Sequence, residues 1–287
     1  MQPLSRRVSI NGLTLHMLDW DAGQPTTILY FPVYTGNAHD ADRFAEAVAD
    51  RYRVVSVDPR GHGDSEWGAA DSYTPANYVA DAKAVLDWLK VPKVVLMGSS
   101  FGAATALKLA ADLPDRTLAL VMDDQPPELP TGRTVNPLLK SYERQKADRF
   151  DSIDAVVAWG QKYRPATWGW NVSDDKVREW AVTAVKDDGN GGLVWKHDAE
   201  ILRCLAPFAG IPEADLRSEF ATIDKPFLLT RRTSEGGSML SPLWEELQVL
   251  NPRARYLSFP EAGHPVIWTQ PEQFTEAVLA FLSDHNI

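Results

Sequence analysis

Residues 93–102 read Lys-Val-Val-Leu-Met-Gly-Ser-Ser-Phe-Gly, and this stretch decides the fold. Its first half, Lys93–Met97, is a compact apolar run of the kind that forms a buried strand. Its second half carries the pattern G-x-S-x-G around Ser100, and an alanine-rich segment with helical spacing, Phe101–Leu113, follows directly. A serine at such a strand-to-helix turn has a strained backbone that exposes its hydroxyl, and only small residues fit on either side. The stretch therefore predicts a nucleophilic serine at the end of a strand.

Strand-like and helical segments alternate on both sides of this turn. The other strand-like runs are Arg7–Trp20, which turns at Asn11-Gly12, and Thr26–Phe31, Arg53–Val57, Leu118–Met122, Lys225–Thr230 and Arg255–Phe259. Helical spacing runs through Asp40–Tyr52, Tyr78–Leu89, Pro242–Leu250 and Pro271–Leu282. This alternation predicts an α/β fold, with a mostly parallel sheet and helices on both of its faces.

The alternation is interrupted after Asp124. Residues 126–217 contain helical segments without a strong strand, and they hold five of the ten tryptophans: Trp159, Trp168, Trp170, Trp180 and Trp195. We therefore predict a core domain made of residues 1–125 and 218–287, with residues 126–217 inserted as a helical unit.

Composition excludes several classes of function. The chain has 29 Lys and Arg against 39 Asp and Glu, and its net charge of −10 disfavours binding to nucleic acid or to an anionic membrane surface. Cys204 is the single cysteine, which excludes an intrachain disulfide and a cysteine cluster for zinc and is typical of a reducing, cytoplasmic compartment. Apolar runs stay well below the roughly 20 residues that span a bilayer, and the first residues do not resemble a signal peptide.

Motifs for cofactors and metals are absent as well. The chain contains neither the phosphate-binding patterns G-x-G-x-x-G and G-K-[ST] nor the zinc pattern H-E-x-x-H. We therefore expect no cofactor and no metal. The expected partner is a small molecule, bound by a monomer or a homodimer, with no nucleic acid or membrane partner.

Three motifs make the chain resemble the α/β-hydrolase superfamily over essentially its whole length. They are the turn at Ser100, the run Asp58–Ser65 (DPRGHGDS) and the stretch Ala262-Gly263-His264-Pro265 ahead of the last helix. The resemblance implies that the inserted unit is a cap above the active site. It also implies that DPRGHGDS is a structural turn, whose charged residues and histidine maintain the fold instead of taking part in catalysis.

His264 is the predicted base that activates Ser100. A serine hydroxyl is a poor nucleophile at neutral pH and needs a neighbouring imidazole. Of the six histidines, His264 lies in a loop flanked by glycine and proline between the strand Arg255–Phe259 and the last helix. The hydrolase fold places its base there, after the serine in chain order.

The acid that orients His264 has two candidates. In most members of the superfamily it follows the strand that corresponds to Lys225–Thr230, in a G-x-x-D loop, but here Arg232 replaces the glycine and Glu235 stands at the aspartate position. Other branches carry the acid one strand earlier, where Asp124 stands. We favour Asp124 and keep Glu235 as the alternative, because the usual loop has lost its pattern. Asp123 is expected to point the other way along its strand, and Arg232 to be solvated.

Two backbone N–H groups are expected to bind the negative oxygen of the tetrahedral intermediate. One belongs to Phe101, directly after the nucleophile. The resemblance places the other in the loop after Thr26–Phe31, where the usual H-G pair is missing and the donor falls on Tyr34, with Val33 as the alternative.

The predicted function is hydrolysis of a carboxylic ester or lactone by a serine hydrolase, with an apolar or aromatic substrate held against the five tryptophans of the insert. The acid before the insert and the altered H-G loop resemble the branch of lactonases that open zearalenone-type macrolides. Two alternatives remain: a small-molecule receptor that retains a hydrolase pocket, and a hydrolase that cleaves C–C bonds in ring-fission products.

Overall fold

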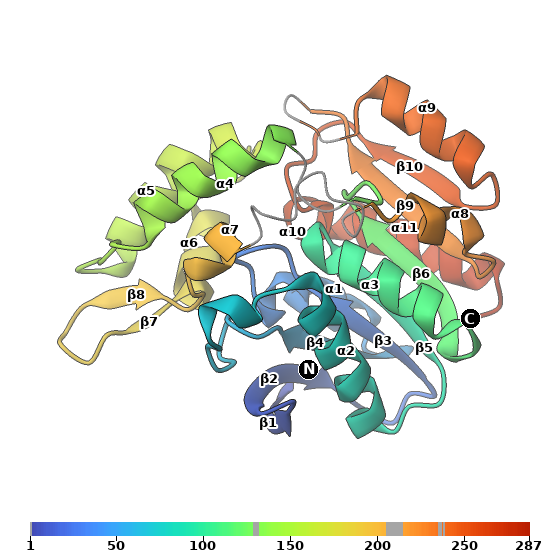
Figure 1. The fold of residues 1–287 in the computed structure, drawn as a ribbon, viewed down its shortest axis with the longest axis horizontal. Coiled ribbons are helices and arrows are strands. Elements are labelled where there is room, and N and C mark those ends of the chain that lie inside the picture. Colours follow the sequence, from blue (N-terminus) through green and yellow to red (C-terminus); the bar gives the residue numbers. More distant parts are fainter. Residues whose placement is uncertain (1, 129–131, 205–214, 235–236, 238) are drawn as a thin grey trace.

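The computed structural model describes residues 2–128, 132–204, 215–234, 237 and 239–287, and within them eight strands form one sheet (Figure 1). The order across the sheet is β1-β2-β4-β3-β5-β6-β9-β10. The strands are β1 (Leu4–Ile10), β2 (Leu13–Trp20), β3 (Thr26–Phe31), β4 (Tyr52–Asp58), β5 (Val94–Ser99), β6 (Thr117–Asp123), β9 (Phe227–Arg232) and β10 (Arg255–Phe259). Only β2 pairs antiparallel with its neighbours β1 and β4, and the other pairs are parallel.

Helices cover both faces of this sheet. On one face lie α2 (Pro75–Leu89), α3 (Phe101–Asp112), α8 (Arg217–Thr222) and α9 (Ser241–Leu250), and on the other lie α1 (Asp42–Val48), α10 (Val266–Thr269) and α11 (Pro271–Asp284). Short 3-10 turns occupy Ala38–Ala41, Ala70–Ser72 and Pro114–Arg116. This arrangement confirms the predicted fold class.

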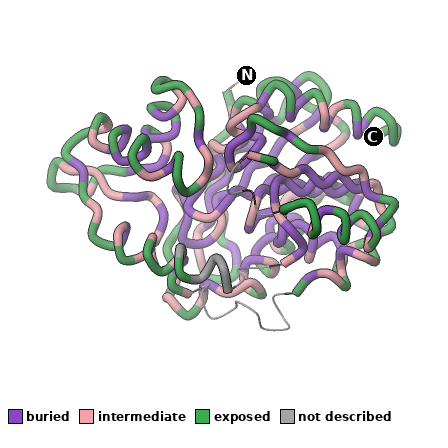
Figure 2. Tube along the Cα trace, turned by 90° about the horizontal axis from the view of Figure 1, so that it is seen from above, coloured by how far each residue is buried: buried purple, intermediate pink, exposed green. Residues whose placement is uncertain are grey.

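The central strands are buried on both faces because their side chains alternate between two cores. In β5, Val94 and Leu96 pack into the core under α2 and α3, whereas Val95 and Met97 pack into the core under α1 and α11. Figure 2 shows the result as buried residues that run along the strands, with exposed residues on the outer surfaces of the helices. Because the central strands are parallel, their carboxyl ends lie at the same edge of the sheet. The turn at Ser100 lies at this edge.

The described part of the segment between β6 and α8 lies to one side of the sheet in Figure 1. It contains α4 (Gly132–Gln145), α5 (Ile153–Trp168), α6 (Asp174–Ala184), β7 (Val185–Asp187), β8 (Leu193–Trp195) and α7 (Glu200–Cys204), ahead of α8. The antiparallel pair β7 and β8 adds two three-residue strands to this segment, for which the sequence predicts no strong strand. Three-residue strands are too short to show a period-2 pattern, and the turn-forming residues Asp188–Gly192 between them are the sequence feature that indicates a hairpin.

This segment has a small core of its own and polar contacts to the rest of the molecule. Four of its tryptophans are buried with Phe150 and the apolar residues of α5 and α6. Contacts to the sheet domain include Lys196 Nζ to Asp64 Oδ2 at 2.8 Å and the Asn37 side-chain amide, which donates to the Thr183 carbonyl at 3.1 Å. The helices of the segment are thereby held next to the loops that follow β3 and β4.

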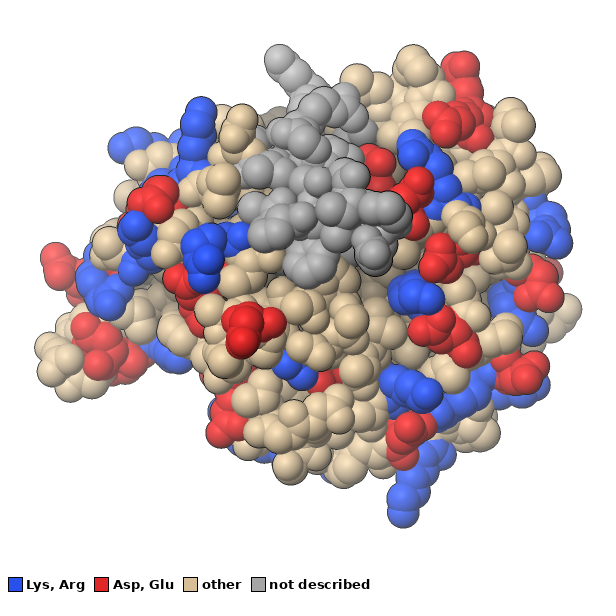
Figure 3. Space-filling model, viewed as in Figure 1, with Lys and Arg blue, Asp and Glu red and all other residues tan. Residues whose placement is uncertain are grey.

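Surface charge is mixed in sign. On the face shown in Figure 3, acidic and basic side chains are interspersed instead of gathering into separate fields. None of the helices in the described parts of the chain is long and apolar enough to cross a membrane.

Candidate active site

Ser100 occupies the turn between β5 and α3 with a left-handed backbone, at φ 52° and ψ −124°. Positive φ is costly for a residue with a side chain, and such strain persists where the surrounding structure imposes it. At Ser100, close backbone contacts of the two neighbouring glycines impose this strain. A Cβ on Gly98 would lie 2.3 Å from the carbonyl oxygen of Gly102, and a Cβ on Gly102 would lie 2.1 Å from the carbonyl oxygen of Phe31. The two glycines of the motif are therefore required by the approach of β3, β5 and α3.

Gly102→Ala is expected to destabilise the fold by roughly 3 kcal/mol or more, because the new methyl group would collide with the backbone of β3. Helix propensity alone predicts the opposite sign, a gain of about 1 kcal/mol. Denaturant unfolding measures the change, and Ala103→Gly in the next position of α3 is the matched control, with an expected loss of about 1 kcal/mol. A Gly102→Ala protein as stable as the wild type would contradict the close approach.

Asp124 and His264 form a hydrogen-bonded pair at the carboxyl end of β6, the strand next to β5 in the sheet. His264 Nδ1 lies 2.8 Å from Asp124 Oδ2, although the residues are 140 positions apart. Asp124 follows β6 with φ 51° and is buried, and its other oxygen, Oδ1, accepts a hydrogen bond from the Arg232 backbone N–H at 3.0 Å. With Nδ1 directed at a carboxylate, the neutral imidazole carries its proton on Nδ1 and leaves Nε2 as an acceptor.

Gln125 is a contact of Ser100 that the sequence reasoning missed. The Ser100 hydroxyl lies 3.4 Å from Gln125 Oε1, and the Gln125 amide donates to the carbonyl oxygens of Pro126 and Glu128 at 3.1 and 2.6 Å. These bonds fix the side-chain amide after β6. The sequence feature that could have identified Gln125 is its position directly after the two acidic residues at the end of the predicted strand.

Asp123 lies in a separate network from Asp124, as the alternation along β6 predicts. Its carboxylate accepts hydrogen bonds from the hydroxyls of Ser99 and Thr230, at 2.8 and 3.0 Å, and from the backbone N–H of Ile267 at 3.2 Å. Burial and the neighbouring Asp124 charge raise the pKa of Asp123 to about 6. Through these hydrogen bonds Asp123, at the end of β6, connects β6 with β5, β9 and α10. Its hydrogen-bond partners among the described residues do not include the imidazole of His264.

Arg232 corrects the expectation of a solvated side chain. It is 6% exposed, its Nε lies 3.2 Å from Asp124 Oδ2, and its Nη1 donates to the Trp168 carbonyl oxygen at 2.9 Å. The physical reason is its place at the end of the buried strand β9, next to a buried carboxylate that needs compensation. The alternative acid, Glu235, lies outside the described residues.

The two predicted oxyanion donors lie on residues that touch each other. Phe101 is the first residue of α3, where a helix leaves its N–H groups without partners from the helix itself. The ring of Tyr34 stacks on the ring of Phe101 at 4.4 Å, with 16° between the planes. The loop of Tyr34 is a turn in which the Gly36 N–H donates to the Val33 carbonyl at 3.1 Å and Thr35 has φ 61°. The structure thus brings Tyr34 and Val33 beside the residue that follows Ser100.

Two of the five predicted pocket tryptophans contact the loop of His264. The ring of Trp168 packs edge-on against the imidazole at 5.8 Å, and its carbonyl oxygen accepts the His264 backbone N–H at 2.8 Å. Trp170 donates its indole N–H to the His264 carbonyl at 2.8 Å. The other three, Trp159, Trp180 and Trp195, pack with one another in the core of the inserted segment.

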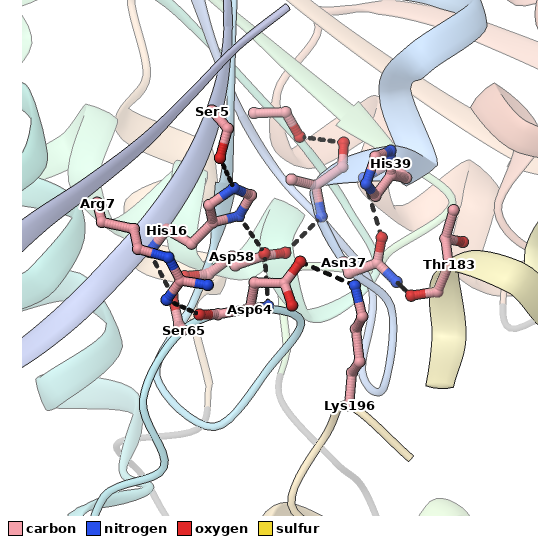
Figure 4. Close-up of polar contacts among 12 residues, drawn as sticks. Ser5, Arg7, His16, Asn37, His39, Asp58, Asp64, Ser65, Thr183 and Lys196 are labelled. Atoms are coloured by element: carbon pink, nitrogen blue, oxygen red, sulfur yellow. Dashed lines mark hydrogen bonds and ion pairs between the residues drawn. The ribbon is translucent and has the colours of Figure 1, made fainter. Parts of the chain in front are cut away.

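The DPRGHGDS run forms a network of hydrogen bonds, and Figure 4 shows the part of it around Asp58, Asp64 and Ser65. Asp58 accepts hydrogen bonds from the backbone N–H groups of Ala38 and Asp64, at 2.6 and 2.9 Å, and contacts His16 Nδ1 at 2.7 Å. Arg60 donates twice to Asp81, at 2.7 Å each. These contacts give the run the structural role that the superfamily resemblance implies.

One group in the described residues has the composition of a metal site: His16, Asp58 and Asp64 offer ligand atoms within 4.8 Å of one another. Protein partners already use these atoms. Asp58 contacts His16 as described, His16 Nε2 lies 2.9 Å from the Ser5 hydroxyl, and Asp64 pairs with Lys196 (Figure 4). A cation here would compete with the Lys196 ammonium, so these residues do not fit a resident metal.

We expect treatment with EDTA to leave the turnover of a chromogenic ester unchanged, because the sequence contains neither the zinc pattern H-E-x-x-H nor a cysteine cluster. The measurement is the initial rate on a chromogenic ester before and after dialysis against the chelator, with the melting temperature recorded in parallel. Inhibition that added zinc or calcium reverses would contradict a mechanism without metal.

Comparison with known proteins finds similarity over most of the chain. The model of the alpha/beta hydrolase family matches residues 10–277. The 2-(acetamidomethylene)succinate hydrolase of Mesorhizobium japonicum is 26% identical over 285 residues, which cover 97% of this chain and 95% of that protein. The N-formylmaleamate deformylase of Pseudomonas putida is 25% identical over 281 residues, which cover 98% and 96%. A crystal structure of E-2-(acetamidomethylene)succinate hydrolase matches with a TM-score of 0.84 at 24% identity and covers 98% of this chain and 99% of that one.

Proposed function

Because the chain belongs to the alpha/beta hydrolase family, we propose that it is a serine hydrolase that cleaves a carboxylic ester or lactone through an acyl-enzyme. The observation that carries this proposal is the 2.8 Å contact between Asp124 and His264 at the same sheet edge as Ser100 on its strained turn. A nucleophile, a base and an acid that orients the base are the parts that acyl transfer requires.

In this mechanism Ser100 Oγ attacks the carbonyl carbon of the substrate while His264 Nε2 takes the hydroxyl proton. The negative oxygen of the tetrahedral intermediate is held by the backbone N–H groups of Phe101 and Tyr34, with Val33 as the alternative donor. His264 then passes the proton to the oxygen of the leaving alcohol, and the C–O bond breaks. Water, deprotonated by His264, hydrolyses the acyl-Ser100 ester and releases the acid.

Asp124 has two tasks in the proposed cycle. It holds the Nδ1–H tautomer of His264, so that Nε2 faces the reaction, and its charge stabilises the imidazolium that forms when the proton is transferred. Arg232 acts on Asp124 from the other side, as a positioning residue: its backbone N–H and its guanidinium hold the carboxylate in place.

The inserted segment, residues 126–217, serves as a cap in this proposal, with Trp168 and Trp170 as the parts of it nearest to the base. Their contacts with the His264 loop support that role. An apolar or ring-bearing acyl or alcohol group would pack against Trp168. Similarity to the lactonases of zearalenone-type macrolides remains a prediction that rests on the acid before the insert.

A second candidate reaction is hydrolysis of a non-ester bond with the same three residues. Its support is the similarity, at 25–26% identity, to a 2-(acetamidomethylene)succinate hydrolase and an N-formylmaleamate deformylase. Cleavage of C–C bonds in ring-fission products belongs to this candidate class. The proposed ester hydrolysis differs from it in the leaving group and therefore in the substrate that is turned over.

The test combines labelling and turnover. A fluorophosphonate probe is expected to label the wild-type protein at Ser100 with one equivalent, and p-nitrophenyl acetate is expected to be turned over many times per active site. Ser100→Ala is the control for both measurements. Stoichiometric labelling without turnover would favour a small-molecule receptor, and faster turnover of a dienoate than of any ester would favour C–C bond hydrolysis.

A further inference from the structure

Arg164 is a buried cation for which the described residues provide no polar partner. Its side chain is in α5, and the residue is 4% exposed. Its Nε and Nη2 atoms have no hydrogen-bond partner among the described residues, and the guanidinium forms no ion pair with them. Buried arginines are ordinarily paired, because an isolated charge inside a protein costs several kcal/mol. Arg164 therefore requires an explanation.

Four indole rings surround the guanidinium, and we call them the tryptophan cluster: Trp159, Trp168, Trp170 and Trp180. The Cζ atom of Arg164 lies 3.7 Å from the ring centre of Trp168, 5.0 Å from Trp180, 5.3 Å from Trp159 and 5.7 Å from Trp170. Ring faces attract the cation, but they do not accept the N–H hydrogens in the plane of the guanidinium. The Nε and Nη2 donors of Arg164 therefore have no hydrogen-bond acceptor among the described residues, and a planar acceptor with two oxygens is the group that would match them.

The position of Arg164 is next to the proposed active site. It precedes Trp168 by one helical turn, so the two side chains share a face of α5. The same Trp168 ring that stacks on the guanidinium packs against the imidazole of His264. The unpaired cation and the proposed base therefore contact the same indole ring.

Neighbouring charges do not neutralise Arg164. Burial, followed by repulsion from Arg144, lowers the pKa of Arg164 to about 9, so the guanidinium stays mostly charged at neutral pH. The carboxylate that attracts it is Asp40, whose pKa burial raises to about 7. Oδ2 of Asp40 is itself buried without a hydrogen-bond partner among the described residues. The charged groups around Arg164 therefore favour the binding of an anion at its guanidinium group.

We propose that Arg164 and the tryptophan cluster form a subsite for a carboxylate group of the substrate, separate from the carbonyl group that reacts. The proposal rests on the proposed function for the reaction, and it adds that the preferred ester or lactone carries a free carboxylate beside an apolar or aromatic part. A bidentate arginine–carboxylate pair satisfies the donors of Arg164 in the buried site. Such a local cation is needed because a chain with a net charge of −10 otherwise repels anions.

The first experiment measures binding in the Ser100→Ala protein, so it does not depend on hydrolysis. Phenylacetate and phenylacetamide are the probes, because they have nearly the same shape and differ in charge. Tryptophan fluorescence is the readout, since the indole rings surround the subsite. We expect saturable quenching by phenylacetate with an affinity roughly tenfold or more above that of phenylacetamide. Equal affinities, or no saturable quenching by phenylacetate, would overturn the proposal.

The second experiment locates the binding on Arg164. In the same background, Arg164→Gln is expected to remove the preference for phenylacetate, and Arg164→Lys to retain part of it, because lysine keeps the charge without the planar fork. Arg178→Gln is the matched control: it removes a cation from the same segment, but Arg178 is exposed and paired with Asp154. A preference that survives Arg164→Gln, or that Arg178→Gln abolishes equally, would overturn the assignment. Should Arg164→Gln fail to fold, the probe pair and Arg164→Lys still decide the question.

Discussion

Ser100→Ala is expected to lower kcat/KM for an ester substrate by a factor of roughly 10⁴–10⁶, the loss seen when the nucleophile of a serine triad is removed. The change deletes one hydroxyl whose described contact is the long 3.4 Å hydrogen bond to Gln125. Folding and substrate binding are therefore expected to stay close to those of the wild type. Steady-state kinetics, circular dichroism and the melting temperature measure the three properties.

Ser99→Ala is the matched control, because it makes the same change one residue earlier in the chain. The Ser99 hydroxyl is buried, donates to Asp123 at 2.8 Å and accepts from Tyr30 at 3.0 Å. This variant is expected to lose about 1–3 kcal/mol of stability while keeping most of its activity. A Ser100→Ala protein with a tenth of the wild-type activity would show that the nucleophile is another group.

The fold could be predicted because its signals are local. Runs such as Thr26–Phe31 and Lys93–Met97 contribute apolar side chains to the cores on both faces of the sheet. Segments with helical spacing separate such runs, so each element can be predicted from its own residues. The turn at Ser100 is equally local: the two glycines, the strand before them and the helix after them are all within about twenty residues. Close backbone contacts then explain why glycine is needed at both positions.

The partners of the charged side chains could not be predicted in the same way. Arg232 on β9 contacts Asp124 after the neighbouring strand β6, although 108 positions separate them in the sequence, and Arg164 is buried by rings from α5 and α6. Both arginines occupy positions that sequence statistics assign to solvent. The burial of Arg164 depends on how α5 packs on α6, and Arg232 contacts the carbonyl oxygen of the last residue of α5; both are tertiary properties. The candidate residues of the site could therefore be predicted from the sequence, whereas the hydrogen bonds and ion pairs of the charged side chains could not.

Of the two candidate acids, the structure describes Asp124, and its contact with His264 supports the proposal that Asp124 orients the base. Asp124 contacts His264 Nδ1, and one Nδ1–H group is fully used by one carboxylate oxygen. The adjacent Asp123 is directed to the hydroxyls of Ser99 and Thr230. The two neighbouring carboxylates thus have different hydrogen-bond partners. Each carboxylate can be replaced by the isosteric amide while the other carboxylate is kept.

Asp124→Asn is expected to lower kcat by roughly 10⁴-fold, the magnitude known for this change in a serine triad. The amide keeps an oxygen that can accept the Arg232 backbone N–H, but its NH₂ group can face His264 Nδ1 and favour the tautomer that leaves no acceptor for the Ser100 proton. It also removes the charge that stabilises the imidazolium. Stability is expected to fall as well, because the buried Arg232 guanidinium loses its carboxylate partner. Activity is therefore measured well below the melting temperature of each variant.

Glu235→Gln is the comparison that decides between the two acids. It is expected to retain activity close to that of the wild type, because His264 Nδ1 already has Asp124 as its partner. Asp123→Asn adds a second comparison: it makes the same chemical change beside Asp124, in a side chain that does not touch the imidazole, and is expected to lower stability more than kcat. A steep loss of kcat for Glu235→Gln, with Asp124→Asn near the wild type, would move the acid to the loop after β9. It would also remove the main support for similarity to the macrolide lactonases, since that similarity depends on an acid placed before the insert.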